Sequence, residues 1–247
     1  MPPRVSHPLL RMTIYGLIAS AIGIAISLWI DWWPPAAAQE AKDIDTLWDV
    51  LLVVSVPVFV LVMGATIYSV RTFKARPGDT GDGEPIHGNT LIEVVWVTIP
   101  FIIVSLLAVY GWIVLDDIEA KQPERLQVDV KGQQFVWRYA YDNPAGGKQI
   151  ESYDLVVPKG RQVEFKIRTD DVIHDFWIPA FRLKIDAVPG LTTEWRATPS
   201  RIGSYDVVCA ELCGLGHSTM RSRVRVVEPG EFDSWLSEAS KPEKAEG

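Results

Sequence analysis

Residues 94–115 read VVWVTIPFIIVSLLAVYGWIVL, an uninterrupted run of 22 residues without a charge. Residues 50–70, VLLVVSVPVFVLVMGATIYSV, form a second run of 21 uncharged residues. Two such runs in tandem are a poor match to the buried helices of a water-soluble core. Because a membrane-spanning helix needs about 20 apolar residues, the sequence predicts a transmembrane hairpin in residues 39–119, with helices at about 48–70 and 92–115.

A third apolar run, residues 12–30, lies near the N-terminus. It follows Arg4 and Arg11 and precedes three alanines at 36–38. A signal peptide has this order of features, although the apolar run is long for one. An uncleaved first membrane helix explains the run equally well. Residues 1–38 are therefore assigned either to a signal peptide or to a retained membrane segment.

The basic residues predict the orientation of the hairpin. Arg71, Lys74 and Arg76 lie between the two apolar runs, and loops rich in Lys and Arg stay on the cytoplasmic side. This rule places the loop 71–90 inside. Residues 116–247 are then outside, in an oxidising compartment where two cysteines need an explanation.

The pattern of the sequence changes after residue 120. Short segments alternate polar and apolar residues, for example LQVDVKGQQFVWRYAY (126–141), QVEFKIRT (162–169) and RSRVRVV (221–227). Turns rich in Gly, Pro, Asp and Asn separate these segments, a spacing typical of a β-sandwich or barrel. We expect a single all-β domain over residues 120–230, followed by a short helix and a polar tail at 231–247.

The composition excludes one class of partner. Hydrophobic residues make up 48% of the chain, and its net charge is −7. An acidic protein lacks the basic surface that nucleic acids require, so we expect no nucleic-acid partner. A basic protein is a better match to this charge. The chain also has no C-x-x-C-H motif, so no c-type heme is attached to it.

The segment CAELCGLGHSTM holds the only two cysteines of the chain, Cys209 and Cys213, followed by His217 and Met220. A further histidine, His174, lies upstream in DVIHDFWIP. A disulfide between the cysteines would leave the neighbouring His and Met unexplained. A zinc site would use both cysteines and both histidines. It would have no need of the thioether, a soft ligand that suits copper.

Copper matches the full set of side chains better. A mononuclear blue-copper site needs two His, one Cys and a weak axial Met, and this chain offers one additional Cys. Two thiolates four residues apart can each bridge two copper ions, with one histidine nitrogen on each ion. Met220 would complete one ion, and a main-chain carbonyl between the cysteines would complete the other. The residues therefore favour a binuclear copper centre over the disulfide and the zinc site.

The pattern C-x-E-x-C-x-x-x-H-x-x-M with an upstream His resembles the CuA motif of cytochrome c oxidase subunit II. The resemblance extends over residues 45–237 and includes both apolar runs and the stretch HDFWIPAFRLKIDAVPG. It implies a cupredoxin-like Greek-key barrel after the transmembrane hairpin. It also implies two copper ions with six ligands: His174, Cys209, Glu211 through its carbonyl, Cys213, His217 and Met220.

The resemblance implies a function for the whole complex. In this family the copper pair accepts electrons from cytochrome c and passes them to heme a in subunit I. There oxygen is reduced to water, and protons are pumped. The implied partners are subunit I, subunit III, cytochrome c and the lipid of a bacterial cell membrane, with the copper domain on the outer face.

Other functions match the residues less well. A quinol oxidase subunit II shares the fold but typically lacks the copper ligands, so it is the disfavoured alternative. A copper chaperone has no need of two bridging cysteines, and a nitrous oxide reductase domain has no need of a membrane hairpin.

Two glutamates receive further roles from the resemblance. The side chain of Glu211 would help to bind a magnesium ion at the boundary with subunit I. Glu93, in the matching context EVVWVTIP, corresponds to a glutamate at the mouth of a proton channel into subunit I. A charge at the edge of the membrane is the plain alternative for Glu93.

The aromatic stretch GQQFVWRYAY contains a departure from the family. The first aromatic residue of that stretch is usually a Trp that receives electrons from cytochrome c, but here it is Phe135. Trp137 matches the later Trp of the family, and core packing is its alternative role. We assign the electron-entry region to Phe135 and Trp137, and the departure leaves open a different or a tethered cytochrome as donor.

Three aspartates surround the upstream histidine: Asp170, Asp171 and Asp175. The family uses acidic residues in this stretch to dock a basic cytochrome c, and such charges mainly raise the rate of encounter. Solvated loop charges are an equally good account of them.

Overall fold

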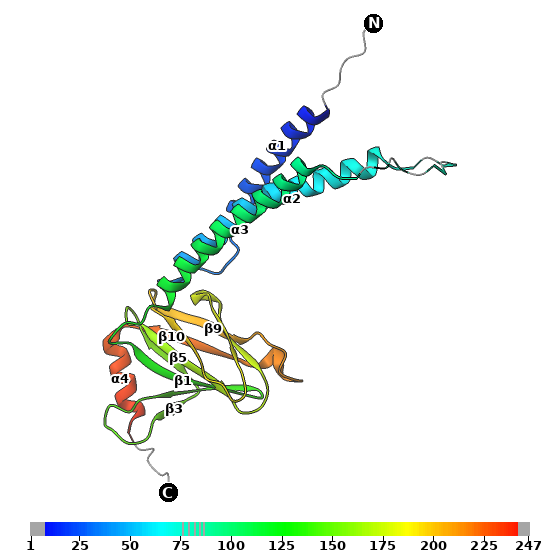
Figure 1. Ribbon diagram of the computed structural model, residues 1–247. Helices are drawn as coiled ribbons and strands as arrows, with labels where there is room; N and C mark the ends of the chain where they lie inside the picture. The colour runs from blue at the N-terminus through cyan, green and yellow to red at the C-terminus, as the bar shows by residue number, and fades with distance from the viewer. Residues whose placement is uncertain are drawn as a thin grey trace. The chain divides into compact units, whose positions relative to one another are not determined.

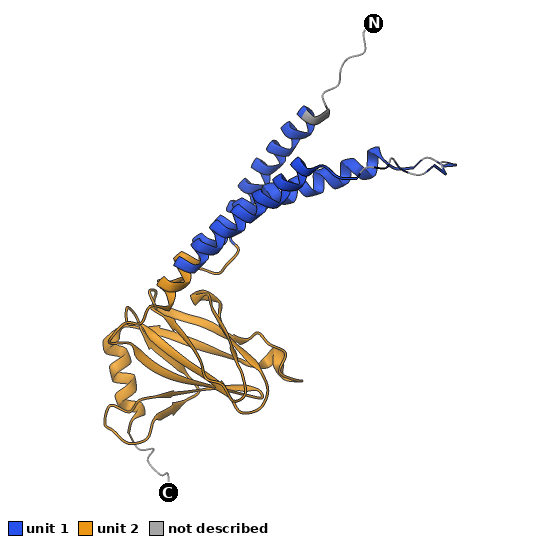
Figure 2. Cartoon of the chain, in the orientation of Figure 1, with its two compact units in different colours: residues 1–31, 46–113 blue, residues 32–45, 114–247 orange. Residues whose placement is uncertain are grey.

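The computed structural model (Figure 1) describes residues 8–75, 77–78, 80–81, 83, 85 and 87–241. The chain divides into two compact units (Figure 2). Unit 1 consists of Met1–Asp31 and Thr46–Ile113, and unit 2 consists of Trp32–Asp45 and Val114–Gly247. Apolar helices form the first unit, and the second contains both β-sheets.

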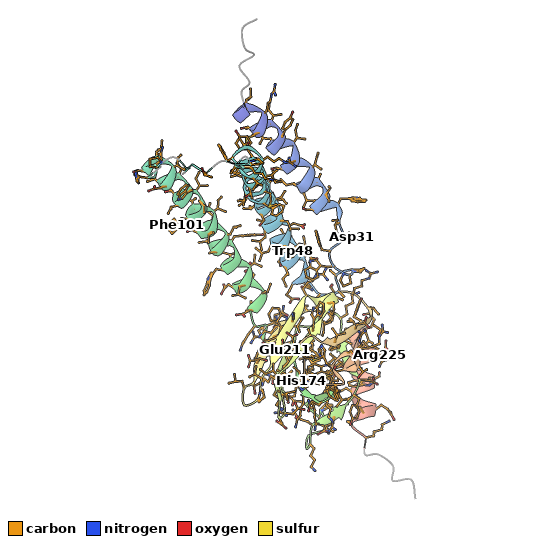
Figure 3. All side chains as sticks on the ribbon, turned by 90° about the vertical axis from the view of Figure 1, so that its right-hand side faces the viewer. Asp31, Trp48, Phe101, His174, Glu211 and Arg225 are labelled. Carbon is orange, nitrogen blue, oxygen red and sulfur yellow. The ribbon has the colours of Figure 1, made fainter. Side chains whose placement is uncertain are left out.

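Unit 1 is built on long apolar helices: α1 (Pro8–Trp29), α2 (Ala41–Thr72) and α3 (Thr90–Glu119). All three are long and apolar enough to cross a membrane. Their side chains project away from the helices, as Phe101 does with 70% exposure (Figure 3). The predicted hairpin is therefore incomplete. The N-terminal run folds as a third candidate span among the residues that the structure describes.

Helices α1 and α2 approach each other closely at Gly23. A methyl group built on Gly23 would lie 2.8 Å from Cγ1 of Val56, so a larger residue would push the helices apart. Small residues are typical of such contacts in membranes. Pro57 and Pro100 lie inside α2 and α3, where neighbouring groups can take up the hydrogen bonds that proline frees.

Unit 2 contains two five-stranded sheets, with strand orders β3-β2-β1-β5-β8 and β4-β10-β9-β6-β7. Most neighbours are antiparallel, but the pairs β1·β5 and β4·β10 are parallel. The strands are β1 Leu126–Gln133, β2 Val136–Tyr141, β3 Ile150–Ser152, β4 Leu155–Pro158, β5 Val163–Thr169, β6 His174–Ile178, β7 Leu183–Ala187, β8 Thr193–Ala197, β9 Gly203–Cys209 and β10 Arg221–Val227. Two short 3-10 helices, η1 Pro179–Phe181 and η2 His217–Thr219, and the C-terminal α4, Pro229–Ala239, complete the unit.

The core of unit 2 follows from the alternation of its strands. In β1 the residues Leu126, Val128 and Val130 are buried, while their neighbours are partly exposed. The aromatic ring of Phe176 from the second sheet packs 5.2 Å from that of Trp137 in the first. The inward faces of both sheets therefore share one hydrophobic core, as a two-layer β domain requires.

The segment before α2 also belongs to unit 2. Ala37 and Ala38 are buried, and the N–H of Ala37 donates to the carbonyl of Ala180 over 2.8 Å. The carboxylate of Glu40 accepts both the N–H and the hydroxyl of Thr198, at 2.8 and 2.7 Å. This chain segment therefore adds to the β domain rather than to the helices.

Candidate metal centre

Two neighbouring strands and one loop place the candidate ligands. Strands β6 and β9 pair in antiparallel register with Phe176 opposite Cys209, which brings His174 level with the residues that follow β9. The loop from Cys209 to Met220, here called the metal loop, then leads into β10. Ligands more than thirty residues apart in sequence thus meet at one end of one sheet. Figure 3 shows His174 among the side chains of this unit.

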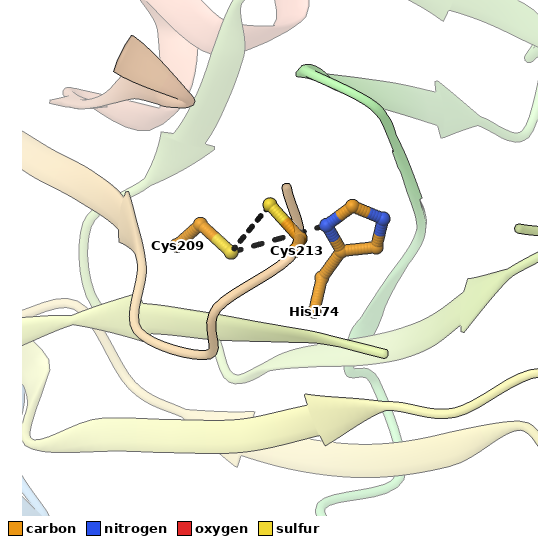
Figure 4. Close-up of side chains that lie close together, drawn as sticks. All are labelled: His174, Cys209 and Cys213. Carbon is orange, nitrogen blue, oxygen red and sulfur yellow. Dashed lines mark hydrogen bonds between the residues drawn. The ribbon is translucent and has the colours of Figure 1, made fainter. Parts of the chain in front are cut away.

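Three buried side chains form the centre of the site (Figure 4). The Sγ atoms of Cys209 and Cys213 are 3.8 Å apart, and both cysteines are free. Nδ1 of His174 lies 3.9 Å from Sγ of Cys209. The exposed fractions of the three residues are 8% or less, so the donor atoms face one another in a largely dry pocket.

Three more donors extend the site along the metal loop. Nδ1 of His217 is 3.7 Å from Sγ of Cys213, and Sδ of the fully buried Met220 is 3.8 Å from the same sulfur. The carbonyl oxygen of Glu211 is 3.3 Å from Sγ of Cys209. Each of the two sulfurs therefore has its own histidine and its own additional donor.

These spacings suit a soft metal ion. Metal–sulfur and metal–nitrogen bonds of about 2.3 and 2.0 Å place two ligands of one ion roughly 3.5 Å apart. The donor pairs here are 3.3 to 3.9 Å apart. Burial and the neighbouring Cys209 raise the pKa of the Cys213 thiol to about 11. The raised pKa means that forming the thiolate costs free energy. A bound cation would offset this cost, because cysteines bind metal ions as thiolates.

Known families match the chain in both units. The transmembrane domain of cytochrome c oxidase subunit II matches residues 27–114, and the periplasmic domain of the same subunit matches residues 144–227. The cytochrome c oxidase subunit 2 of Thermostichus vulcanus is 32% identical over 282 aligned residues, which cover 90% of this chain and 84% of the relative. The chain belongs to the cytochrome c oxidase subunit II family.

Further members of the family are similar to the whole chain or to its β domain. The subunit 2 of Synechocystis sp. is 31% identical over 275 aligned residues, covering 90% of this chain and 82% of the relative. The crystal structure of the periplasmic domain of subunit II from Bradyrhizobium japonicum is 33% identical, with a TM-score of 0.44, and covers 49% of this chain and 95% of its own. The sequence comparisons confirm the resemblance that the metal motif indicated.

Of the three aspartates that family resemblance assigned to donor docking, Asp170 is exposed. Its side chain is 72% exposed and pairs with Lys131. Asp171 faces the metal histidine instead, with Oδ1 2.8 Å from Nε2 of His174. Asp175 is 5% exposed, and burial above all raises the pKa of its carboxyl to about 6. Of the three carboxylates, only that of Asp175 is buried, and a role in docking stays a prediction for the other two.

The two aromatic residues assigned to electron entry lie in different surroundings. Phe135 is 37% exposed, and its ring packs on the metal loop, where a methyl group built on Gly216 would lie 2.4 Å from its Cδ2. Trp137 is 1% exposed, and its ring centroid is 5.9 Å from that of His174. Phe135 thus joins the surface to the metal loop, while Trp137 packs behind the site.

Glu93 lies in the first turn of α3. Its Oε1 accepts the N–H of Asn89 at 3.2 Å, and the side chain of Asn89 accepts the N–H of Ile92 at 3.2 Å. Reciprocal bonds of this kind satisfy the free N–H groups at a helix start. Glu93 therefore caps the helix, whatever further role its carboxylate has.

Sequence reasoning did not single out Gln134 or Gly132. Nε2 of Gln134 donates to the carbonyl of Cys213 over 2.5 Å. A methyl group built on Gly132 would lie 3.1 Å from Cδ2 of His174. The only signal in the sequence was a glycine inside a strand, which often marks a close approach.

Proposed function

We propose that this chain is the electron-entry subunit of a cytochrome c oxidase and that its β domain holds a binuclear copper centre. The observation that carries the proposal is the set of four donors around two free, buried sulfurs, six candidate ligands in all. The proposed ligands are His174, Cys209, the carbonyl of Glu211, Cys213, His217 and Met220.

The distribution of the histidines favours two ions over one. His174 forms a mutually close group with both cysteines, and His217 is not a member of that group among the described residues. His217 lies instead beside Cys213, on the side of Met220. A tetrahedral zinc site would need both histidines around a single point. Two ions bridged by the two sulfurs use each histidine once.

The chain supplies the conditions that electron transfer needs. Two copper ions bound here would share one electron through the bridging thiolates. The protein fixes the ligands on β6, β9 and the metal loop and buries Met220 and His174 completely. A rigid, dry site changes little when the charge of the centre changes, which keeps the barrier to electron transfer low.

The surface near the centre suits a protein donor. Phe135 and Leu215, the latter fully exposed, present apolar groups around the metal loop, and Asp170 adds an exposed carboxylate that pairs with Lys131. We take the donor to be cytochrome c and the acceptor to be heme a in subunit I, where oxygen is reduced to water and protons are pumped. Glu93 is proposed to lie at a proton entrance, and the exposed side chain of Glu211 is proposed to help bind magnesium at the boundary with subunit I.

The remaining expectations complete the proposal. The two sheets of unit 2 are taken as a cupredoxin-like Greek-key barrel. The chain is placed as a multi-pass protein in a bacterial cell membrane with the β domain on the outer face. Subunit III is a further partner. A quinol oxidase subunit II is disfavoured because such chains typically lack the copper ligands, and this chain has all of them.

The test is the metal content and the spectrum of the full chain, purified in detergent and loaded with copper. We expect two copper ions per chain and an electron paramagnetic resonance spectrum with seven hyperfine lines, because two equivalent copper nuclei share one electron. Cys213→Ser should abolish that pattern, whereas Ser218→Ala in the same loop should preserve it. One copper per chain, or zinc retained in preference to copper, would contradict the proposal.

A further inference from the structure

The β1–β2 turn touches both segments that carry metal ligands. Gln134 lies in this turn, between the end of β1 and the start of β2. Its backbone N–H donates to Oδ2 of Asp171 over 2.8 Å, and its side-chain Nε2 donates to the carbonyl of Cys213 over 2.5 Å. One residue therefore connects the segment before His174 with the metal loop.

The carboxylate of Asp171 is held by several donors at once. Its Oδ1 accepts the hydroxyl of Thr169 and the N–H of Val172, both at 2.7 Å, in addition to Nε2 of His174 at 2.8 Å. Its Oδ2 accepts the N–H of Gln134. Both oxygens of Asp171 therefore face hydrogen-bond donors from the domain, so Asp171 acts here as an acceptor.

The donors around Asp171 determine which nitrogen of His174 carries a hydrogen. Since both carboxylate oxygens accept hydrogen bonds from other groups, the ring is the donor in the contact with Asp171, and its hydrogen sits on Nε2. The lone pair is then on Nδ1, which points at Sγ of Cys209 from 3.9 Å. The ring is thereby prepared as a metal ligand before any metal arrives.

We propose that Asp171 and Gln134 are positioning residues of the metal centre and that they act as one bracket. Asp171 fixes the tautomer and the orientation of His174. Gln134 ties that carboxylate to the carbonyl of Cys213, so the β6 ligand and the metal loop are held at one spacing. The inference rests on the copper centre proposed above.

The bracket competes with a different role for Asp171, that of a docking charge for a donor protein. The side chain of Asp171 is 26% exposed, and both of its oxygens accept hydrogen bonds from within the domain. Its neighbour Asp170 is 72% exposed and pairs only at the surface, with Lys131. The two adjacent aspartates thus offer a matched pair, one facing the metal centre and one facing solvent.

The first test compares Asp171→Asn with Asp170→Asn in the full chain purified in detergent. Asparagine keeps the size of the side chain but loses the charge, and its amide nitrogen cannot accept the N–H of Gln134. Residues that orient metal ligands typically contribute about 10- to 100-fold in metal affinity, and we expect a loss of that size from competition with a copper chelator. A carboxylate on the ring strengthens the ligand, so its removal should also raise the reduction potential and alter the copper hyperfine splitting. Asp170→Asn should leave all three unchanged.

The second test addresses the other arm of the bracket. Gln134→Leu keeps the backbone N–H to Asp171 but removes the donor to Cys213. We expect faster loss of copper to the chelator. Gln133→Leu, at the exposed neighbouring position, should release copper at the wild-type rate.

A third variant covers the case in which Asp171→Asn does not fold. Thr169→Val removes only the hydroxyl that donates to Oδ1 of Asp171. It should change the copper affinity and the reduction potential in the same direction as Asp171→Asn, but by a smaller amount. The inference is overturned if the wild-type chain binds two copper ions while Asp171→Asn, or Thr169→Val in its place, matches Asp170→Asn in affinity, potential and spectrum. If the wild-type chain itself does not bind two copper ions, the proposed function is wrong, and this failure is distinguished from a failure of the bracket by the wild-type measurement alone.

Discussion

Phe135 and Gly216 are matched to each other at the scale of single residues. The family places a larger aromatic residue at position 135, and here the phenyl ring lies against the glycine backbone of the metal loop. A methyl group at position 216 would come within 2.4 Å of Cδ2 and 2.5 Å of Cγ of that ring. The absence of a side chain at position 216 is therefore what allows the ring to contact the metal loop.

Gly216→Ala should displace the ring of Phe135 without disturbing the ligands. The backbone at Gly216 has φ of −90°, which alanine adopts freely, so the effect comes from overpacking. We expect a loss of about 1–3 kcal/mol in the free energy of unfolding and slower electron entry from a reduced donor, with copper content unchanged.

The matched control for this prediction is Gly230→Ala, since a methyl group there has nothing within 4 Å. Stopped-flow reduction of the copper-loaded chain measures the rate of electron entry. An unchanged rate in Gly216→Ala would show that the contact between Phe135 and the metal loop has no part in electron entry.

Glu93→Gln separates the two roles of this residue. Glutamine can still accept the N–H of Asn89, so the cap at the start of α3 is preserved. It cannot carry a proton as a carboxylate does. We expect slower turnover of the assembled oxidase, with copper content and the thermal stability of the complex unchanged. Equal turnover of variant and wild type would leave Glu93 with the capping role alone.

At the scale of elements, alternation in the sequence predicted strands whose polar side chains stand between apolar ones. β1 and β10 alternate in burial, and both were predicted from period two. β4 is buried at every position, because α4 packs on it. β6 lies between β9 and β7 in its sheet and is buried at four of five positions. Neither shows the alternation that marks a strand, and β3, with only three residues, is too short to show it.

In the metal site, too, some residues could be predicted from their spacing in the sequence, and others could be found only in the folded structure. The proposed ligands from Cys209 to Met220 are close in sequence, so their spacing and side-chain types indicated a metal site, and the family resemblance added the carbonyl of Glu211. Asp171 was read as a surface charge and Gln134 was not singled out, because their roles depend on a turn and a loop that meet only in the folded domain. Sequence patterns report on neighbours along the chain, and the supporting contacts here are between segments.

Strand β5 carries a buried charge that fixes the start of the domain. The side chain of Glu164 is 2% exposed. It forms an ion pair with Nε of Arg125 at 2.9 Å and accepts a hydrogen bond from Nε of Arg196 at 2.9 Å. Arg196 also donates to the carbonyl of Glu119, the last residue of α3. Through its two arginines, the buried carboxylate therefore connects three parts of unit 2: the end of α3, the segment before β1 and strand β8.

Glu164→Gln should destabilise the domain by about 3–5 kcal/mol at neutral pH, because it leaves two arginines without their buried partner. Burial would raise the pKa of Glu164, but Arg125 and Arg196 lower it below its usual range. A carboxyl whose pKa is lower in the folded state stabilises the fold fully at a pH above its unfolded pKa. This stabilisation is lost as the pH falls through the folded pKa. The difference between variant and wild type should therefore narrow as the pH falls below about 4.

Thermal unfolding in detergent, followed by tryptophan fluorescence across that pH range, measures the effect. Glu194→Gln is the matched control, since Glu194 also pairs with Arg196 but its side chain is 38% exposed. An exposed pair contributes about 1 kcal/mol or less. Equal losses in the two variants would argue against a buried, specific role for Glu164.

At the scale of the whole molecule, the connection between α1 and α2 constrains how the chain crosses a membrane. The segment Trp32–Asp45 belongs to the β unit, and Arg182 of that unit holds Asp45 through two bonds of 2.7 and 2.8 Å. The α1–α2 connection and the β domain must therefore lie on the same side of the membrane. We therefore expect α2 to cross to the opposite side and α3 to return, which places the loop 71–90 on the side opposite to the β domain.

The basic residues of the loop 71–90 predict which side of the membrane is cytoplasmic. Arg71 lies in the last turn of α2, Lys74 follows the helix, and Arg76 lies outside the described residues; such clusters stay in the cytoplasm. A protease site inserted after Gly83 should therefore be cut only in inside-out vesicles, and one inserted after Ser240 only in right-side-out vesicles. The result does not depend on whether α1 is retained, since the loss of α1 leaves both crossings in place. Cleavage after Gly83 from the outer face would contradict the orientation, and cleavage of both sites from the same face would contradict the pair of crossings itself.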